Sequence, residues 1–342
     1  MDTFQMLTNQ TAGRNETVPD GAGPVEDVLQ LTIFLNHGVC GVLSLLGIGA
    51  NVINMAVFLK QGFNESINVS LFGLAVADLA GLVTLLWASV CWTPWLYYAR
   101  LVFVPADVEY LTGSLPHLLF TRVTGWVTAF VALERCLCTV MPLKVKIILT
   151  FTRVKVVVVL IFVFVAAAHS PSFYTSGLAW TFLPAENRTA LALFSREGRQ
   201  AIDGVTYSVN LVSPFGSFVT VLACTVVTAF KLQRVLKWRQ NSILTHDAAS
   251  QKESKVIRMV VVMSVIFIVS FLPTNLVHMF YCAIADKPEV VAAYWDAMST
   301  AFSFIKILEA FNASVSIVLY LRMSSRYRNV FCAMFGLACP AG

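Results

Sequence analysis

Charged residues are scarce in this sequence. Only 13% of its 342 residues are Asp, Glu, Lys or Arg, while 57% are hydrophobic. Soluble domains contain nearer a quarter charged residues, so most of this chain needs apolar surroundings. The apolar residues come in long runs and not in the short alternating segments of an outer-membrane barrel. The composition therefore excludes an ordinary soluble protein and favours membrane helices.

Signatures of several other protein classes are also missing. The sequence has no metal-ligand cluster, no phosphate-binding glycine loop and no nucleophile–base pattern, so we do not expect an enzyme. It shows neither internal repeats nor the paired Gly/Pro-broken helices that are typical of transporters. No separate signal peptide is expected, because the N-terminus is polar and the first apolar run is too long for a signal core.

Seven apolar runs are long enough to cross the hydrocarbon core as helices. About 20 helical residues span its roughly 30 Å, and a helix satisfies the backbone polar groups there. We predict an all-α membrane protein, with a flexible extracellular tail at 1–30 and a seven-transmembrane helix bundle at 31–321. The runs are Leu31–Leu59, Ile67–Tyr98, Leu111–Leu133, Val156–Leu183, Val205–Phe230, Met259–Ala285 and Ala297–Leu321.

The charges between the runs set the predicted orientation. The N-terminal tail and the even-numbered connections carry six basic residues against thirteen acidic ones, and the opposite side carries sixteen basic residues against four acidic ones. Because positively charged loops stay cytoplasmic, we expect a multi-pass protein of the plasma membrane with an extracellular N-terminus. The sequons at Asn9, Asn15 and Asn187 then lie outside, where glycans are added.

The segment 322–342 follows the last run on the predicted cytoplasmic side. Within it, Ser324–Phe335 sets two arginines against aromatic residues, a pattern typical of a short amphipathic helix that lies against membrane lipids. We therefore expect an eighth helix and a short tail. Cys332 and Cys339 are juxtamembrane cysteines and candidates for palmitoylation, with two unmodified thiols as the alternative.

Short motifs recur in order along the runs. They are Gly49-Ala-Asn51, Leu74-Ala-Val-Ala-Asp78-Leu79, Glu134-Arg135-Cys136, Pro214, Phe267-Ile-Val-Ser-Phe271-Leu-Pro273 and Ser316-Ile-Val-Leu-Tyr320. This series resembles the signatures of the rhodopsin-like (class A) G-protein-coupled receptors and covers roughly Leu31–Phe335. The resemblance implies an extracellular ligand and a heterotrimeric G protein as partners, and no nucleic acid.

The sequence departs from that family at several positions. Tyr110 stands where the family has a disulfide cysteine and 177–204 contains none, so we expect a second outer loop that is less tethered than usual. Phe271 replaces the usual tryptophan, and Ile317 replaces the usual proline. With Asn312-Ala-Ser314, these departures resemble the invertebrate FMRFamide-type peptide receptors and molluscan chemosensory receptors. The ligand of such a receptor is a chemosensory small molecule or a short neuropeptide.

The resemblance also assigns residues to the switch and to G-protein coupling. An Arg135–Glu253 pair would clamp spans three and six shut, and breaking it would give the two-state element that a receptor needs. The alternative is that Glu253 is one charge among several at a solvated loop. The full set is Glu134, Arg135, Glu253, Phe267, Phe271, Pro273 and Tyr320.

Asp78 is an acid in the middle of a span. Burying an ionisable group in the membrane is energetically expensive, so Asp78 is a functional candidate. The resemblance places Thr124, Asn312 and Ser316 near it. An allosteric sodium ion or a proton would satisfy the buried charge, and a hydrogen-bonded cluster without an ion is the alternative. No other cofactor is expected.

Candidate ligand-binding residues lie in the outer halves of the spans. His117 shares a helix face with Arg135, whereas Arg122 points about 140° away. Tyr207 and Asn210 are candidate partners for Arg122, and Lys306 and Glu309 can pair because they are three residues apart. The candidates are His117, Thr121, Arg122, Tyr207, Asn210, Asn275, His278, Lys306 and Glu309.

The sequence leaves the ligand class open. The basic members of this set favour an acidic or carbonyl-bearing ligand, whereas the negative outer surface favours a cation by steering. An opsin is disfavoured, because Ala310 stands where opsins carry the retinal-binding lysine. A seven-helix transporter or channel, or a receptor that couples to no G protein, would also fit seven apolar spans.

Overall fold

A computed structural model describes the chain over 24–338, apart from 64, 98, 185–186, 197–198, 242–247 and 285–286. The backbone alone is described at 24–27, 29, 97, 143, 146, 195, 199–211, 235–241, 248–255, 288, 292 and 295–296. The predicted glycosylation sites Asn9 and Asn15 and the predicted palmitoylation site Cys339 lie outside the described residues.

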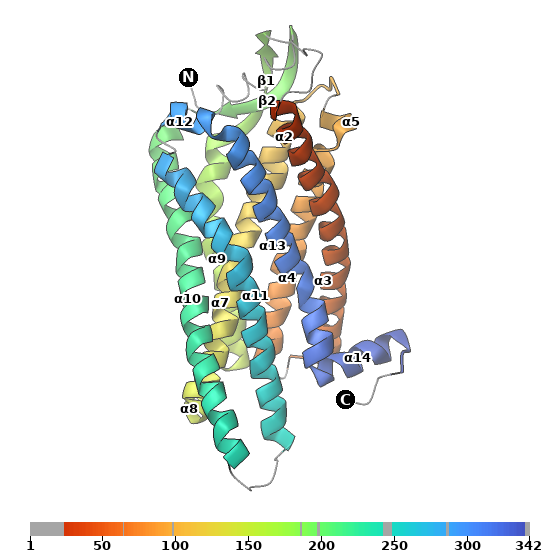
Figure 1. The fold of residues 1–342 in the computed structure, drawn as a ribbon, viewed down its shortest axis with the longest axis vertical. Helices are drawn as coiled ribbons and strands as arrows, with labels where there is room; N and C mark the ends of the chain where they lie inside the picture. The colour runs from red at the N-terminus through yellow and green to blue at the C-terminus, as the bar shows by residue number, and fades with distance from the viewer. Residues whose placement is uncertain are drawn as a thin grey trace.

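Seven helices in the described part of the chain are long and apolar enough to cross a membrane. Figure 1 shows them side by side as one bundle, which confirms the predicted seven-helix architecture. The first and third spans each contain a π-helical segment. The spans are built from α2 (Pro24–Ile33), η2 (Phe34–Cys40) and α3 (Gly41–Gln61), α4 (Ser66–Cys91), α6 (Pro105–Glu109), η3 (Tyr110–Ser114) and α7 (Leu115–Val140), α9 (Phe151–Thr175), α10 (Arg199–Asn241), α11 (Ala248–Ile284) and α13 (Trp295–Met323).

Two predicted spans end earlier than expected. The second helix ends at Cys91 and not at Tyr98, because Pro94 opens a separate short helix, α5 (Pro94–Tyr97), where its missing N–H costs nothing. The fourth helix ends at Thr175, and the rest of the predicted run forms a strand, β1 (Ser176–Leu183). A short apolar run fits a strand as well as a helix, so periodicity alone does not separate the two.

A β-hairpin stands at one end of the bundle (Figure 1). β1 pairs antiparallel with β2 (Arg188–Ser195) in a register that sets Trp180 opposite Leu191. Asn187, the predicted glycosylation site, lies exposed in the turn with a left-handed φ of 46°, a conformation that asparagine tolerates better than most residues. We call this end of the molecule the hairpin end and the opposite end the α14 end.

Hydrogen bonds tie the hairpin to the start of the third span and to the residues just before it. Leu191 N–H donates to Val102 O at 2.8 Å, and Val104 N–H donates to Leu191 O at 2.9 Å. The buried carboxylate of Asp107 accepts from Leu193 N–H at 2.9 Å. Main-chain pairing and one carboxylate therefore hold the loop where the family has a disulfide, a tether that the sequence did not predict. All seven cysteines among the described residues are free.

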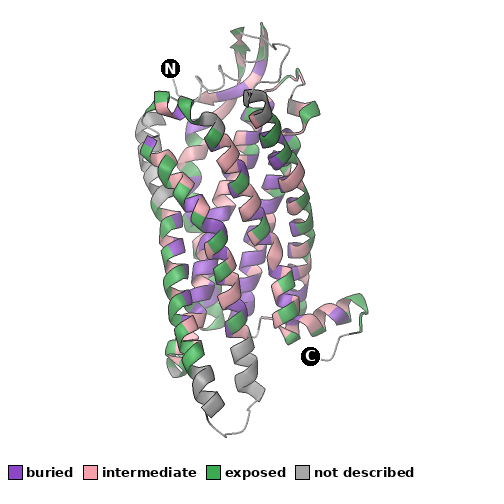
Figure 2. Cartoon of the chain, in the orientation of Figure 1, coloured by how far each residue is buried: buried purple, intermediate pink, exposed green. Residues whose placement is uncertain are grey.

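Figure 2 shows exposed residues on the outer faces of the helices and buried residues between them. Many of the exposed side chains are large and apolar, and the interior holds polar groups. On α9, Val159, Val163 and Phe164 are exposed, whereas Asp78 and Glu134 are buried inside the bundle. A soluble helical protein has the reverse pattern. This arrangement suits lipid surroundings, and the chain is a multi-pass membrane protein.

The eighth helix, α14 (Ser325–Phe335), turns away from the end of α13 and projects sideways from the bundle (Figure 1). The prediction of a short amphipathic helix is confirmed. Its N-cap, Ser324, accepts a hydrogen bond from the backbone N–H of Tyr327 at 3.2 Å. Arg326 binds Glu65 at 2.7 Å, which fixes α14 to the connection after α3. Cys332 is buried, so its thiol is poorly placed for acylation.

Candidate functional site

Polar side chains occur at successive levels through the interior of the bundle. From the hairpin end to the α14 end, the levels centre on Lys306, His117, Asp78, Asn54 and Glu134. Polar groups are costly away from water, so each level needs internal partners. α13, α7, α4 and α3 supply most of them.

The level nearest the hairpin end joins Lys306 to the third span. Lys306 Nζ lies 3.5 Å from Glu109 Oε1 and 3.2 Å from Ser114 Oγ. Ser114 Oγ in turn donates to the same Glu109 oxygen at 2.5 Å. The predicted Lys306–Glu309 pair is wrong, because Lys306 reaches across to Glu109 of α6 and Ser114 of η3 instead of along its own helix. Glu109 was missed from sequence, although a cation inside a span is itself a signal that an anion lies near.

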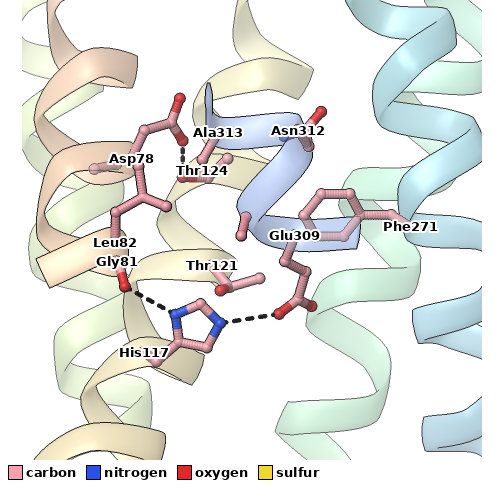
Figure 3. Close-up of a pocket in the computed structure, with 12 residues that line it drawn as sticks. Asp78, Gly81, Leu82, His117, Thr121, Thr124, Phe271, Glu309, Asn312 and Ala313 are labelled. Carbon is pink, nitrogen blue, oxygen red and sulfur yellow. Dashed lines mark hydrogen bonds and ion pairs between the residues drawn. The ribbon is translucent and has the colours of Figure 1, made fainter. Parts of the chain in front are cut away.

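The second level is a buried pair between His117 and Glu309 (Figure 3). His117 Nε2 lies 3.1 Å from Glu309 Oε2, and His117 Nδ1 lies 3.0 Å from Gly81 O. Carbonyl and ionised carboxylate oxygens only accept, so an ionised Glu309 requires a proton on both ring nitrogens of His117. In the alternative protonation state, a neutral Glu309 donates to Nε2. Thr121 and Phe271 line the same small cavity.

The third level is centred on Asp78, where Thr124 Oγ1 donates to Asp78 Oδ1 at 2.7 Å (Figure 3). Asn312 lines the cavities on both sides of Asp78, and Ser316 lines the one toward the α14 end. The predicted neighbours of Asp78 are therefore present. Carboxylate, hydroxyl and amide oxygens are the donors that a hard cation prefers. This set fits a sodium ion, although Ser316 Oγ already accepts from Asn54 Nδ2 at 3.0 Å.

Arg122 is 2% exposed and lies in the interior. Its Nε and Nη2 atoms have no hydrogen-bond partner among the described residues. It interacts electrostatically with Glu309, His278 and Cys282, and no ion pair within 4 Å joins it to any described carboxylate. The side chains of its predicted partners, Tyr207 and Asn210, lie outside the described residues.

Two other candidates on α11 bond to their own helix. Asn275 Nδ2 donates to Phe271 O at 2.8 Å. His278 Nδ1 lies 2.8 Å from Thr274 O, so that nitrogen carries a proton and Nε2 remains for other contacts. Asn275 therefore uses its amide N–H within its own helix, whereas Nε2 of His278 can contact a ligand.

The level nearest the α14 end belongs to the Glu134–Arg135 motif. Glu134 is fully buried, and its Oε2 accepts from Ser70 Oγ at 2.7 Å. Arg135 interacts electrostatically with Glu134, and its Nε has no hydrogen-bond partner among the described residues. The side chain of Glu253 lies outside the described residues, so the proposed Arg135–Glu253 clamp stays a prediction.

Aromatic residues of the switch set form two packed groups. Phe267 and Phe271 stack with centroids 4.2 Å apart on α11, just before Pro273, which lies inside that helix. Tyr320 is buried and meets Phe58 edge to face at 5.3 Å. A movement of α11 would disturb the packing of the Phe267–Phe271 stack, and a movement of α13 against α3 would separate Tyr320 from Phe58.

Comparison with known families gives a match over most of the chain. Residues 39–338 match the family model described as serpentine type 7TM GPCR chemoreceptor Srw. A search of curated proteins finds no match. The family match supports a non-enzymatic G-protein-coupled receptor at the level of chemoreceptors, which is coarser than the class A or FMRFamide-type resemblance. This chain, with seven membrane-spanning helices around a buried polar interior, belongs to the serpentine 7TM GPCR chemoreceptor Srw family.

Proposed function

We propose that this protein is a chemosensory receptor that binds an extracellular ligand from the hairpin end and activates a heterotrimeric G protein at the α14 end. One observation carries the proposal. A fully buried Glu134, held by Ser70 at 2.7 Å, sits beside Arg135 at the α14 end of the third span in a chemoreceptor family member. A buried acid is costly to the fold, so we assign this one, beside a partly exposed arginine, a role in the switch.

The proposed orientation places the hairpin end outside the plasma membrane. It rests on the charge asymmetry of the connections, because basic loops stay cytoplasmic. The exposed Asn187 then faces the compartment in which glycans are added. The basic α14 end, with Arg326 and Arg328, faces the anionic inner leaflet.

The mechanism proposed is a shift between two arrangements of the bundle. Ligand bound near His117 and Glu309 would favour the arrangement in which α11 has moved. Pro273 would be the point at which α11 bends, and the Phe267–Phe271 stack would repack as it does so. A sodium ion or proton at Asp78 would favour the resting arrangement by binding there more tightly.

The test is ligand-free G-protein activation in cells expressing the wild type, Arg135→Ala and Glu253→Ala. We expect Glu253→Ala to raise basal signalling severalfold, because it removes the clamp, and Arg135→Ala to abolish it. Arg100→Ala, a change at an exposed arginine near the hairpin end, is the matched control and should signal as the wild type does. If the wild type and Glu253→Ala are both silent with every G-protein class despite surface expression, coupling is refuted and a non-coupling receptor remains.

A further inference from the structure

The guanidinium of Arg122 is buried with part of its hydrogen-bonding capacity unused. The residue is 2% exposed, and Nε and Nη2 have no hydrogen-bond partner among the described residues. An unpaired buried donor costs about 1–3 kcal/mol, and more when it is charged. A guanidinium stays protonated in proteins, so it cannot avoid this cost by neutralisation. An acceptor from outside the described side chains would remove the cost.

The two unpartnered nitrogens define which acceptor fits. In a guanidinium, Nε–H and one N–H of Nη2 lie on the same edge and point the same way. This edge forms two parallel hydrogen bonds to a group with two oxygens in one plane. A carboxylate has that geometry, whereas a single carbonyl or a hydroxyl satisfies one N–H at a time.

The one described carboxylate near Arg122 is already shared, which leaves the guanidinium charge open to an anion. α13 contributes Glu309, whose Oε2 is already bonded to His117 Nε2 at 3.1 Å. α11 contributes His278 and Cys282, and α9 contributes His169. Glu309 is the one carboxylate among the described residues with which Arg122 interacts, and it is shared with a histidine. An added amine would increase the positive charge of this region.

A second buried polar group, His169 on α9, interacts electrostatically with Arg122. It is 2% exposed, and its Nδ1 lies 2.9 Å from Val165 O, so that nitrogen carries a proton. Its Nε2 is buried without a hydrogen-bond partner among the described residues. Because Nδ1 holds the proton, Nε2 of a neutral His169 is an acceptor, so it would take a water or a hydroxyl, whereas the carboxylate fits Arg122 alone.

We propose that the ligand of this receptor carries a carboxylate, which binds side-on to Nε and Nη2 of Arg122. The inference rests on the proposed receptor function, because it assigns the chemical class of the ligand. Arg122 lies five residues beyond His117 on α7, about 7.5 Å further from the hairpin end. The acid group must therefore reach deep into the bundle, as a small organic acid or the free C-terminus of a peptide would. Amidated peptides lack the group.

The test is thermal unfolding of the purified full-length receptor in detergent with matched probes. The probes are benzoate, benzamide and benzylamine, and propionate, propionamide and propylamine, each at millimolar concentration. We expect the carboxylates to raise the Tm of the wild type and the amides and amines to leave it unchanged. Arg122→Gln should weaken the apparent affinity for the carboxylates about 10- to 100-fold, the loss expected for hydrogen bonds to a charged group.

Two variants separate the anchoring role from general damage. Arg122→Lys keeps the charge but loses the parallel pair of donors, so it should bind the carboxylates more weakly than the wild type and remain folded. Arg153→Gln makes the Arg→Gln change at an exposed position of α9 and should bind the carboxylates as the wild type does. A Tm rise with a peptide's free C-terminus but not with benzoate or propionate would assign the carboxylate to a peptide.

Several outcomes overturn the proposal. They are equal stabilisation by chloride, which would mean recognition of charge alone, stabilisation by an amine, and the absence of any carboxylate-dependent shift in the wild type. An unchanged carboxylate response in Arg122→Gln would likewise exclude Arg122 as the anchor. Because this assay contains no G protein, a failure of coupling in cells leaves its result intact.

Discussion

At the scale of single residues, the hydroxyl of Tyr327 links three elements. It donates to Asn54 Oδ1 at 2.7 Å, and Asn54 Nδ2 donates to Ser316 Oγ at 3.0 Å, so α14, α3 and α13 share one network. Tyr327→Phe removes only the hydroxyl. We expect a loss of about 1–2 kcal/mol, because the buried oxygen of Asn54 loses its donor. Thermal unfolding of the purified receptor measures the loss.

The same hydroxyl predicts a pH dependence. Burial raises the pKa of Tyr327 above its ordinary value near 10. The unfolded chain therefore releases this proton first as the pH rises, so the stabilisation is complete below pH 10 and is lost above it. Tyr327→Phe should flatten the fall in stability above that pH. Tyr294→Phe, at an exposed tyrosine, is the control, and an equal effect of the two changes would contradict the assignment.

Several polar residues of the interior could be named from sequence, but fewer of their pairs. Asp78 and Thr124 were matched through the family resemblance, and they bond at 2.7 Å. Lys306 was matched to Glu309 because they are three residues apart on one helix, yet it pairs with Glu109, which is 197 residues away. Local spacing gives the neighbours on one helix, whereas partners across helices depend on how the helices pack.

At the scale of elements, the hairpin depends on Asp107. Its carboxylate accepts the backbone N–H of Leu193 in a buried position. Asp107→Ala should leave that N–H unsatisfied, which costs about 1–3 kcal/mol locally and speeds hydrogen exchange across 176–195. Asp107→Asn keeps an acceptor oxygen and should stay close to the wild type. Exchange measured by mass spectrometry would contradict the tether if Asp107→Ala left the hairpin as protected as before.

The helices were predictable because length and hydropathy suffice for a membrane span. The hairpin was not, because 176–183 reads equally well as the end of the fourth helix or as a strand. Its pairing with β2, and the pairing of Leu191 with Val102 and Val104, involve segments that are far apart in the chain. No pattern within either segment specifies such contacts.

At the scale of the whole molecule, the fold is held without covalent links among the described cysteines. Seven cysteines are free, and Cys40, Cys91 and Cys332 are buried. The hairpin, which a disulfide would otherwise fix, is held by hydrogen bonds to Val102, Val104 and Asp107. Packing and hydrogen bonds therefore take the place of the disulfide in this receptor.

We accordingly expect a reducing agent to leave the receptor intact. Dithiothreitol should change neither the Tm of the purified protein nor the hydrogen exchange of the hairpin, because reduction has no described bridge to break. A receptor that carries the outer disulfide, treated in parallel, should lose stability and serves as the positive control. A drop in Tm of this receptor on reduction would contradict the hydrogen-bonded tether and imply a disulfide. In the Asp107→Ala variant, dithiothreitol should cause no further loss of Tm or of hairpin protection. That variant lacks the carboxylate that holds the hairpin, and it has no described disulfide to reduce.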